Sequence, residues 1–412
     1  MLSPDDLALV ERDPALPGLA LLLDLDALET LLGGAVRRRY LRYKPGTGCV
    51  LALDVDGEQA FAVGYSTAAR PKLDKTVRAA PRGSVLAVDR TRGVLVARLR
   101  ADRDLPGLAR LSGDLHRSLA RLLRGTDMEG ADLAGADLTT LSHKPQRRWV
   151  GLLAPRATDP VVVRVHRPAD VRARHAFVRS LATGQPWSPS LLGADARHGI
   201  SVLSWLPGAG LHDLLAMGRA TDAHVRATGA AVAALHARPL GELAVRPAEA
   251  DGADLRRAAA AVAALVPELS ARSAALAEHL TAALAERRPL PVPAHGDLSA
   301  DQVVVDARGR TGLIDLDAVT GAEPALDLGS AVAALHVSCL LGSGPWNVEG
   351  TAALLLDGYD RPVDEHRLQA QVAAGLLRRA VEPFRQCTPG WRDAAVELVA
   401  LAERTSVVRL PR

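Results

Sequence analysis

The stretch "HGDLSADQ", residues 295–302, together with "LIDLD", residues 313–317, decides the fold of this chain. An apolar run, "VVV" (303–305), follows the first stretch, and the polar segment "ARGR" (307–310) leads into the second. This order predicts a β-hairpin, because short apolar runs separated by a Gly-containing turn are typical of paired strands. The hairpin would bring the loop before its first strand close to the end of its second strand.

Polar side chains stand at both of these positions. Asp297 and Gln302 lie on the loop, and Asp315 lies at the strand end. Phosphoryl transfer needs a group that orients the attacking hydroxyl, and hard oxygen ligands for the metal ion that bridges the phosphates. Two carboxylates and one amide oxygen meet both needs, so the hairpin predicts a kinase-type site.

A longer pattern surrounds the hairpin. It comprises His295-Gly296-Asp297, Gln302-Val303, Ile314-Asp315-Leu316-Asp317 and the downstream pair Asp327-Leu328. The pattern resembles that of the aminoglycoside phosphotransferase and choline-kinase-like superfamily, and the resemblance covers roughly residues 140–412. It implies a bilobal, protein-kinase-like α+β fold and a kinase that uses ATP and Mg²⁺.

The resemblance also implies roles for individual residues. Asp297 matches the catalytic residue that accepts the proton of the substrate hydroxyl, and His295 belongs to the same catalytic motif, where it shapes the loop. Asp315 matches a metal ligand, and Gln302 stands at the position of the second ligand. Asp327 would orient the loop rather than take part in the chemistry.

Nucleotide contacts are implied in the preceding segment. Arg164, in "VVVRVH" (161–166), lies where the family has a Lys that binds phosphate. The backbone of the segment that joins the two lobes would contact adenine through Ser204, Trp205 and Leu206.

The chain departs from the family pattern in three ways. Gln302 replaces Asn, as in the maltokinase branch of the superfamily, and so moves the amide oxygen outward by one methylene. Arg164 keeps the positive charge of the usual Lys but carries it on a planar guanidinium group. The helix expected over residues 168–184 has Arg174 and His175, and no Glu to pair with a Lys. A pseudokinase that binds without transferring phosphate therefore stays open as an alternative.

Two segments in the first half align without gaps at an offset of 100 residues. They are Tyr43–Ser66 and His143–His166, and each is expected to form a strand, a turn and a strand. Residues 92–108 similarly resemble residues 198–215. We expect a duplicated small lobe, with two unrelated hairpins that share a turn as the alternative.

Two details of this alignment bear on the site. In this alignment, Gly64 of the first copy occupies the position of Arg164 in the second. The segment "KPGTG" (44–48) contains two glycines and could cradle a phosphate, although a plain hairpin turn is the favoured interpretation.

Helical periodicity rich in Ala and Leu replaces the strand pattern after residue 210. We therefore expect three parts: a small-lobe-like repeat over 1–138, a kinase N-lobe over 139–206, and a helical C-lobe with the catalytic loop over 207–412. The fold class is α+β, with an additional N-terminal α/β lobe. His236 closes one of the helices, and we interpret it as structural.

The composition excludes several classes of function. The net charge is +3, and the basic residues are dispersed without interleaved aromatics, which argues against nucleic acid as a partner. The three cysteines form no CxxC motif. The N-terminus has no signal-peptide pattern, and no apolar run approaches the ~20 residues of a membrane span. A cytoplasmic protein without a membrane partner is the expectation.

The acceptor is less sharply defined. It would be a hydroxyl of a small molecule, either an aminoglycoside or a sugar-like metabolite, and a Ser or Thr of a natural-product precursor peptide is an alternative. The extra lobe suits a protein partner. Carboxylates that could bind a polycationic antibiotic are Glu323, Asp357, Asp360, Asp364, Glu365 and Glu382, but nearby arginines offset them.

Overall fold

The computed structural model describes residues 1–126, 128–130, 133, 136–156, 158–170, 188–286, 288–344 and 346–407. The expected helix over 168–184, with Arg174 and His175, lies largely outside them. Contacts between Cα atoms divide the chain into two units. Unit 1 comprises residues 1–175, 190–205 and 385–387, and unit 2 comprises residues 176–189, 206–384 and 388–412.

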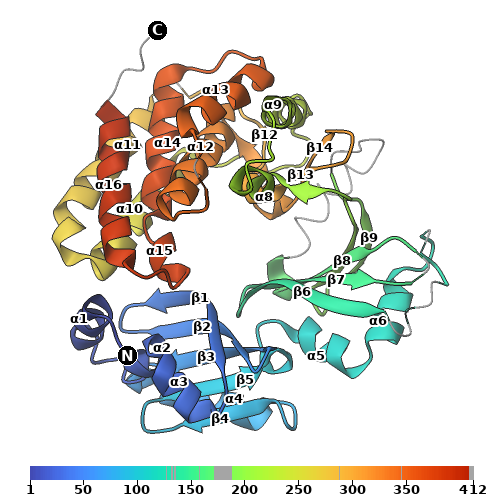
Figure 1. Cartoon of the computed structure of the whole chain (residues 1–412), viewed down its shortest axis with the longest axis vertical. Coiled ribbons are helices and arrows are strands. Elements are labelled where there is room, and N and C mark those ends of the chain that lie inside the picture. Colours follow the sequence, from blue (N-terminus) through green and yellow to red (C-terminus); the bar gives the residue numbers. More distant parts are fainter. Residues whose placement is uncertain are drawn as a thin grey trace. The chain divides into compact units, whose positions relative to one another are not determined.

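Unit 1 contains two five-stranded antiparallel sheets that share one strand order (Figure 1). The orders are β1-β2-β3-β5-β4 and β6-β7-β8-β10-β9. The first sheet consists of β1 (Val36–Lys44), β2 (Gly48–Val55), β3 (Glu58–Tyr65), β4 (Val85–Asp89) and β5 (Val94–Arg98). The second consists of β6 (Asp137–Lys144), β7 (Arg148–Ala154), β8 (Val161–His166), β9 (Leu191–Asp195) and β10 (Ile200–Ser204).

Short helices precede each sheet and pack against it. The first group is α1 (Pro4–Arg12), α2 (Leu19–Leu23) and α3 (Leu25–Leu32), and the second is α5 (Pro106–Gly113) and α6 (Leu115–Leu122). Helix α2 contacts β2 and β3, and α5 contacts β8. A further helix, α4 (Arg70–Ala79), lies between β3 and β4 in the chain.

The two copies build their first turn in the same way. The backbone amide of Gly46 donates to the carboxylate of Asp13 at 2.8 Å, and that of Gln146 donates to Asp102 at 2.6 Å. Each Asp stands three residues before a Leu-Pro-Gly sequence that leads into a helix. The duplication therefore includes the helices that precede the sheets.

The pairing of strands corrects one detail of the sequence alignment. Val150 pairs with Arg164 across β7 and β8, whereas Val50 pairs with Val63 across β2 and β3. Val63, and not Gly64, is therefore the counterpart of Arg164. The gapless alignment fails because the turn between β2 and β3 is shorter than the turn between β7 and β8.

Unit 2 is mainly helical and confirms the expected α+β class. Its helices are α8 (Leu211–Ala216), α9 (Asp222–His236), α10 (Ala248–Leu265), α11 (Ser270–Ala285), α12 (Pro324–Leu340), α13 (Val348–Tyr359), α14 (Glu365–Arg379), α15 (Glu382–Arg385) and α16 (Trp391–Val407). Its strands are β11 (Ala209–Gly210), β12 (Val292–Ala294), β13 (Val303–Val305), β14 (Thr311–Leu313) and β15 (Thr320–Ala322). Strands β13 and β14 form the predicted hairpin, with Val304 opposite Gly312.

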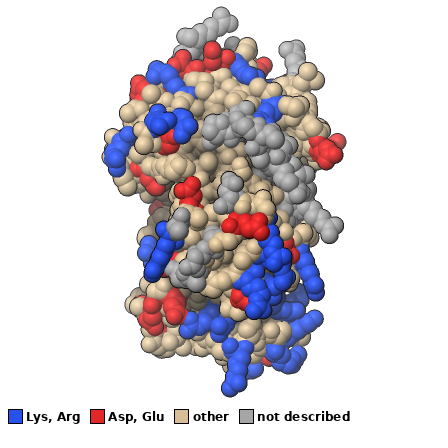
Figure 2. Space-filling view, turned by 90° about the vertical axis from the view of Figure 1, so that its right-hand side faces the viewer, with Lys and Arg blue, Asp and Glu red and all other residues tan. Residues whose placement is uncertain are grey.

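The two units differ in charge. Unit 1 carries 30 Lys and Arg against 22 Asp and Glu, and unit 2 carries 20 against 25. Figure 2 shows blue Lys and Arg side chains gathered on one face of unit 1. Among the described residues, no helix has the length and apolar character that a membrane crossing requires.

Replacement of Gly107 by Ala should destabilise unit 1. A Cβ atom at this position in α5 would lie 2.7 Å from Val165 Cγ1 and 2.8 Å from both His198 O and Ile200 Cγ1. We expect Gly107→Ala to lower the free energy of unfolding by about 1–3 kcal/mol in chemical denaturation.

Gly113, in the same helix, is the matched control, because a Cβ there meets no atom within 4 Å. Gly113→Ala should leave stability unchanged or raise it, since Ala favours the helix. Equal effects of the two changes would contradict the close approach of α5 to β8.

Candidate functional site

The loop that carries Asp297 is shaped by a glycine. It follows β12, which pairs with β15. Gly296 has a φ of +87°, and a Cβ there would lie 2.2 Å from the carbonyl oxygen of Ala318. Both observations exclude a larger residue, which explains why Gly separates His295 from Asp297.

Asp327 anchors the same loop from the first turn of α12. Its Oδ2 accepts the backbone N–H of His295 at 2.6 Å, and its Oδ1 accepts that of Gly296 at 2.8 Å. His236, at the end of α9, contacts Oδ2 through Nε2 at 3.0 Å, and its Nδ1 lies 2.9 Å from the hydroxyl of Tyr359. One buried carboxylate thus joins the loop to three helices.

The surroundings of Asp327 keep it ionised. Its residue is fully buried, and burial alone would raise the pKa of the carboxyl. The hydrogen bond from His236, the charges of the two histidines and the amide of Gly296 outweigh burial and hold the pKa below its ordinary value of 3.8. The expected loop-orienting role of Asp327 thus has a physical basis.

Asp297 projects from this loop and meets an arginine. Its side chain is 60% exposed, whereas that of Arg379, at the end of α14, is 11% exposed. Both terminal nitrogens of Arg379 donate to Oδ1 of Asp297, at 3.1 and 3.4 Å, and one also donates to Ser330 Oγ at 3.0 Å. Arg379 therefore holds one oxygen of an otherwise exposed carboxylate.

Arg379 remains charged despite its burial. Burial lowers the pKa of a guanidinium, but the carboxylates of Glu382 and Asp297 raise the pKa of Arg379 above its ordinary value. The charge is therefore permanent at any physiological pH.

The hairpin brings the two expected metal ligands to neighbouring positions. The amide of Ile314, next to Asp315, donates to the carbonyl of Gln302 at 2.9 Å. Gln302 is buried, and its Oε1 has no hydrogen-bond partner among the described residues. A buried acceptor without a donor is costly, so this oxygen fits a cation ligand.

Asp315 has a strained backbone. Its φ of 63° and ψ of 42° lie in the left-handed region, which is uncommon for a residue other than Gly. Such strain is concentrated at functional sites. Among the described residues no cluster of three or more His, Cys, Asp and Glu is suited to a metal.

His295 connects the two sides of the site. Its side chain is buried, and its Nε2 donates to the carbonyl oxygen of Ile314 at 2.9 Å. This hydrogen bond joins the loop before β13 to Ile314, the residue that precedes Asp315. In this arrangement His295 positions the loop and does not face the solvent.

The other expected site residues divide between the units. Arg164 is buried in β8 of unit 1, on the face opposite the core residues Val163 and Val165. Ser204 ends β10, and its hydroxyl accepts the amide of Ser190 at 2.9 Å. Ser204 and Trp205 belong to unit 1, whereas Leu206 belongs to unit 2.

Two contacts of the site escaped the sequence analysis. In the sequence Arg379 is one of several arginines near acidic residues, and nothing in its spacing indicates that it reaches Asp297. The position of His236 at the end of a helix predicts a structural role, but it does not predict the contact with Asp327. A His at the end of a helix and a buried Asp at the start of another are compatible with such a link but do not specify it.

Comparison with known proteins gives one family. The model of the phosphotransferase enzyme family matches residues 141–364, which is more than half of the chain. It confirms the resemblance inferred from the hairpin and its flanking motifs. No curated protein matches the chain in sequence.

Solved structures show the same fold. A choline/ethanolamine kinase family protein from Mesorhizobium loti is 17% identical, with a TM-score of 0.50, and the match covers 71% of this chain and 95% of that one. A choline kinase from Cryptosporidium parvum is 9% identical, with a TM-score of 0.52 and the same two coverages. These likenesses confirm the kinase-like fold.

Replacement of Asp327 by Asn should loosen the site. An amide retains only one acceptor oxygen, so one backbone N–H of the loop would face an N–H₂ group. We expect Asp327→Asn to lower the free energy of unfolding at pH 7 by about 3 kcal/mol, because it breaks a buried charged network. Chemical denaturation followed by circular dichroism measures this loss.

The loss should depend on pH. Because the folded pKa of Asp327 is lowered, its contribution is complete above the unfolded value of about 3.8 and is lost as the pH falls through the folded value. The stabilities of Asp327→Asn and the unchanged protein should therefore converge in acid. Asp393→Asn, in the exposed first turn of α16, is the control and should have little effect. A constant difference down to pH 3 would contradict this role.

Proposed function

This chain belongs to the phosphotransferase enzyme family, and from that premise we propose that it is an ATP- and Mg²⁺-dependent kinase that phosphorylates a hydroxyl group of a small molecule. The observation that carries the proposal is the joint placement of Asp297, Gln302 and Asp315 around one hairpin. The buried carboxylate of Asp327 supports the proposal because it fixes the loop. Phosphoryl transfer depends mainly on how precisely the reacting groups are positioned.

Asp297 would act on the acceptor. It orients the hydroxyl and takes its proton while the new O–P bond forms and the bond between the γ-phosphorus and the departing ADP oxygen breaks. Arg379 positions the carboxylate by holding Oδ1, which directs Oδ2 to the acceptor.

Gln302 and Asp315 would hold Mg²⁺. When bound, the ion would supply positive charge that offsets the negative charge on the phosphates during transfer. Gln302 supplies a neutral oxygen that is already desolvated, and Asp315 supplies the negative charge.

Four residues of the chain are proposed to hold the nucleotide. We assign Arg164 to the phosphates, because a guanidinium can bind phosphate oxygens with two parallel hydrogen bonds. Ser204, Trp205 and Leu206 would contact the adenine through their backbone.

A sugar-like acceptor fits better than a polycationic antibiotic. At least three of the six carboxylates that could attract a polycation have partners within the fold. Glu323 binds Arg367 and Gln371, Asp357 binds Arg226 and Asp364 caps α14. Glu323 is buried, and a polycation would have to compete with these partners for the other two.

The test is release of ADP from ATP and Mg²⁺ in the presence of a panel of sugars, aminoglycosides and hydroxyl-bearing peptides. We expect turnover with a neutral polyol. Asp297→Asn should lower that turnover by about 10²–10⁴-fold, since it removes the proton acceptor. Asp301→Asn, a change of an exposed carboxylate on the same loop, should keep it within about twofold.

Two results would contradict the proposal. Retention of turnover by Asp297→Asn would remove Asp297 from the chemistry. A properly folded protein that binds nucleotide but transfers phosphate to no acceptor and to no water would instead be a pseudokinase.

A further inference from the structure

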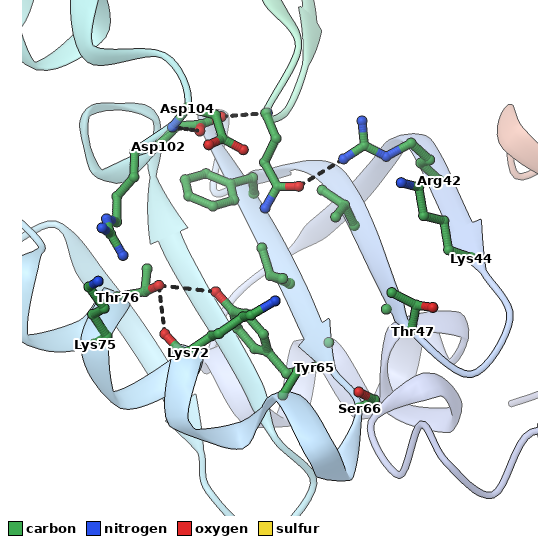
Figure 3. A pocket seen from close by; sticks show the side chains of 18 of the residues that line it. Arg42, Lys44, Thr47, Tyr65, Ser66, Lys72, Lys75, Thr76, Asp102 and Asp104 are labelled. Atoms are coloured by element: carbon green, nitrogen blue, oxygen red, sulfur yellow. Dashed lines mark hydrogen bonds between the residues drawn. The ribbon is translucent and has the colours of Figure 1, made fainter. Parts of the chain in front are cut away.

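A pocket of about 820 Å³ opens on the first sheet of unit 1 (Figure 3). Apolar side chains of β2 and β3, among them Val50, Phe61 and Val63, form part of its lining. Helix α4 and the turn at residues 44–48 border it, and Gln146 reaches it from the second sheet. Its volume lies within the range of about 300–1,000 Å³ that small-molecule sites occupy.

The pocket gathers lysines in a chain that has almost none. Lys occurs four times in 412 residues, and three of these, Lys44, Lys72 and Lys75, line this pocket. Arg42 and Arg103 add two more positive charges. Figure 3 shows Lys72 and Lys75 on α4 and Arg42 and Lys44 on β1.

These positive charges are poorly compensated. No carboxylate lies within 4.0 Å of the three lysine amino groups among the described residues, whereas other cations of unit 1, such as Arg39 and Arg98, form ion pairs. Burial, followed by the charges of Arg147 and Arg167, lowers the pKa of Arg42. The region therefore has an excess of positive charge.

The two carboxylates of the pocket, Asp102 and Asp104, offset only part of the charge of its five cations. Asp102 accepts the backbone amides of Gln146 and Asp104, at 2.6 and 3.1 Å, and is 3% exposed. Burial raises its pKa to about 6. Asp104 is exposed to solvent, where its charge is screened.

Side chains rather than backbone amides would make the polar contacts. The turn "KPGTG" forms the expected hairpin turn, and its amides are occupied: Gly46 donates to Asp13 and Thr47 to the carbonyl of Lys44. Hydroxyl groups of Thr47, Ser66 and Thr76 also line the pocket. A ligand would thus place its anionic part among lysines and hydroxyls, and a flat body on the apolar strands.

We propose that this pocket is a second ligand site of the chain, which binds a phosphate ester of nucleotide size that carries two or more negative charges. Lys44, Lys72 and Lys75 contact the phosphates, and Phe61 and Val63 contact the body. The site lies in the first copy, where Val63 stands in place of Arg164, and no residue of the proposed catalytic site lines it.

The test measures ATP binding by isothermal titration calorimetry. It uses the full chain carrying Asp315→Ala, with EDTA present, so that Mg²⁺-dependent binding at the proposed catalytic site does not contribute. We expect saturable binding that weakens by about tenfold or more when Lys72 and Lys75 are both changed to Ala, because charged hydrogen bonds to phosphate are lost. Binding should also weaken with salt.

Arg78→Ala with Arg82→Ala is the matched control. It removes the same charge from α4 and the turn after it, outside the pocket lining, and should keep the affinity within about twofold. Tripolyphosphate should bind more weakly than ATP, because it has no flat body to contact the apolar strands.

Three results would overturn the proposal. One is no binding of ATP or ADP at millimolar concentration. A second is an equal loss in the lysine and arginine variants, which would indicate a general charge effect. A third is binding of a short oligonucleotide far more tightly than ATP, which would assign the surface to nucleic acid.

Discussion

The carboxylate of Asp327 is the contact on which the proposed active site depends. It is fully buried and negatively charged, and such a group is tolerated only when donors surround it. Two of its donors are the backbone amides that precede Asp297, and a third is His236. The same bonds that satisfy the buried charge therefore fix the loop. Gly296 follows from this constraint, because the loop must turn sharply against Ala318 while both amides point to one carboxylate.

Unit 1 shows how a duplicated lobe has diverged. Both copies keep the same strand order and the same cap, in which Asp13 or Asp102 accepts the amide of the first turn. The second copy has Arg164 in the strand where the first has Val63. The first copy instead has Lys72 and Lys75 on α4, whereas the lysine before the first turn occurs in both copies, as Lys44 and Lys144. The two copies thus share their backbone arrangement and differ in their polar side chains. This difference is expected if each copy binds a different ligand.

The sequence predicted the hairpin, the repeat and the class of the fold because each depends on local pattern. Alternating and continuous apolar runs indicate strands, and Gly-containing turns join them. The sequence did not reveal the pairing of Arg379 with Asp297, because it joins residues 82 positions apart on elements whose packing is set by tertiary contacts. The one-residue shift at Arg164 also escaped detection, since differences in turn length are invisible to a gapless alignment.

The most direct measurement is hydrolysis of ATP by the purified chain with Mg²⁺, beside the Asp315→Ala variant. The account predicts slow release of phosphate that requires Mg²⁺ and disappears in the variant, because Asp315 supplies the charged metal ligand. Folding of the variant is checked by its circular dichroism spectrum. Hydrolysis that survives loss of Asp315, or a folded protein that never hydrolyses ATP with any acceptor present, would contradict the assignment of this hairpin as a phosphotransfer site.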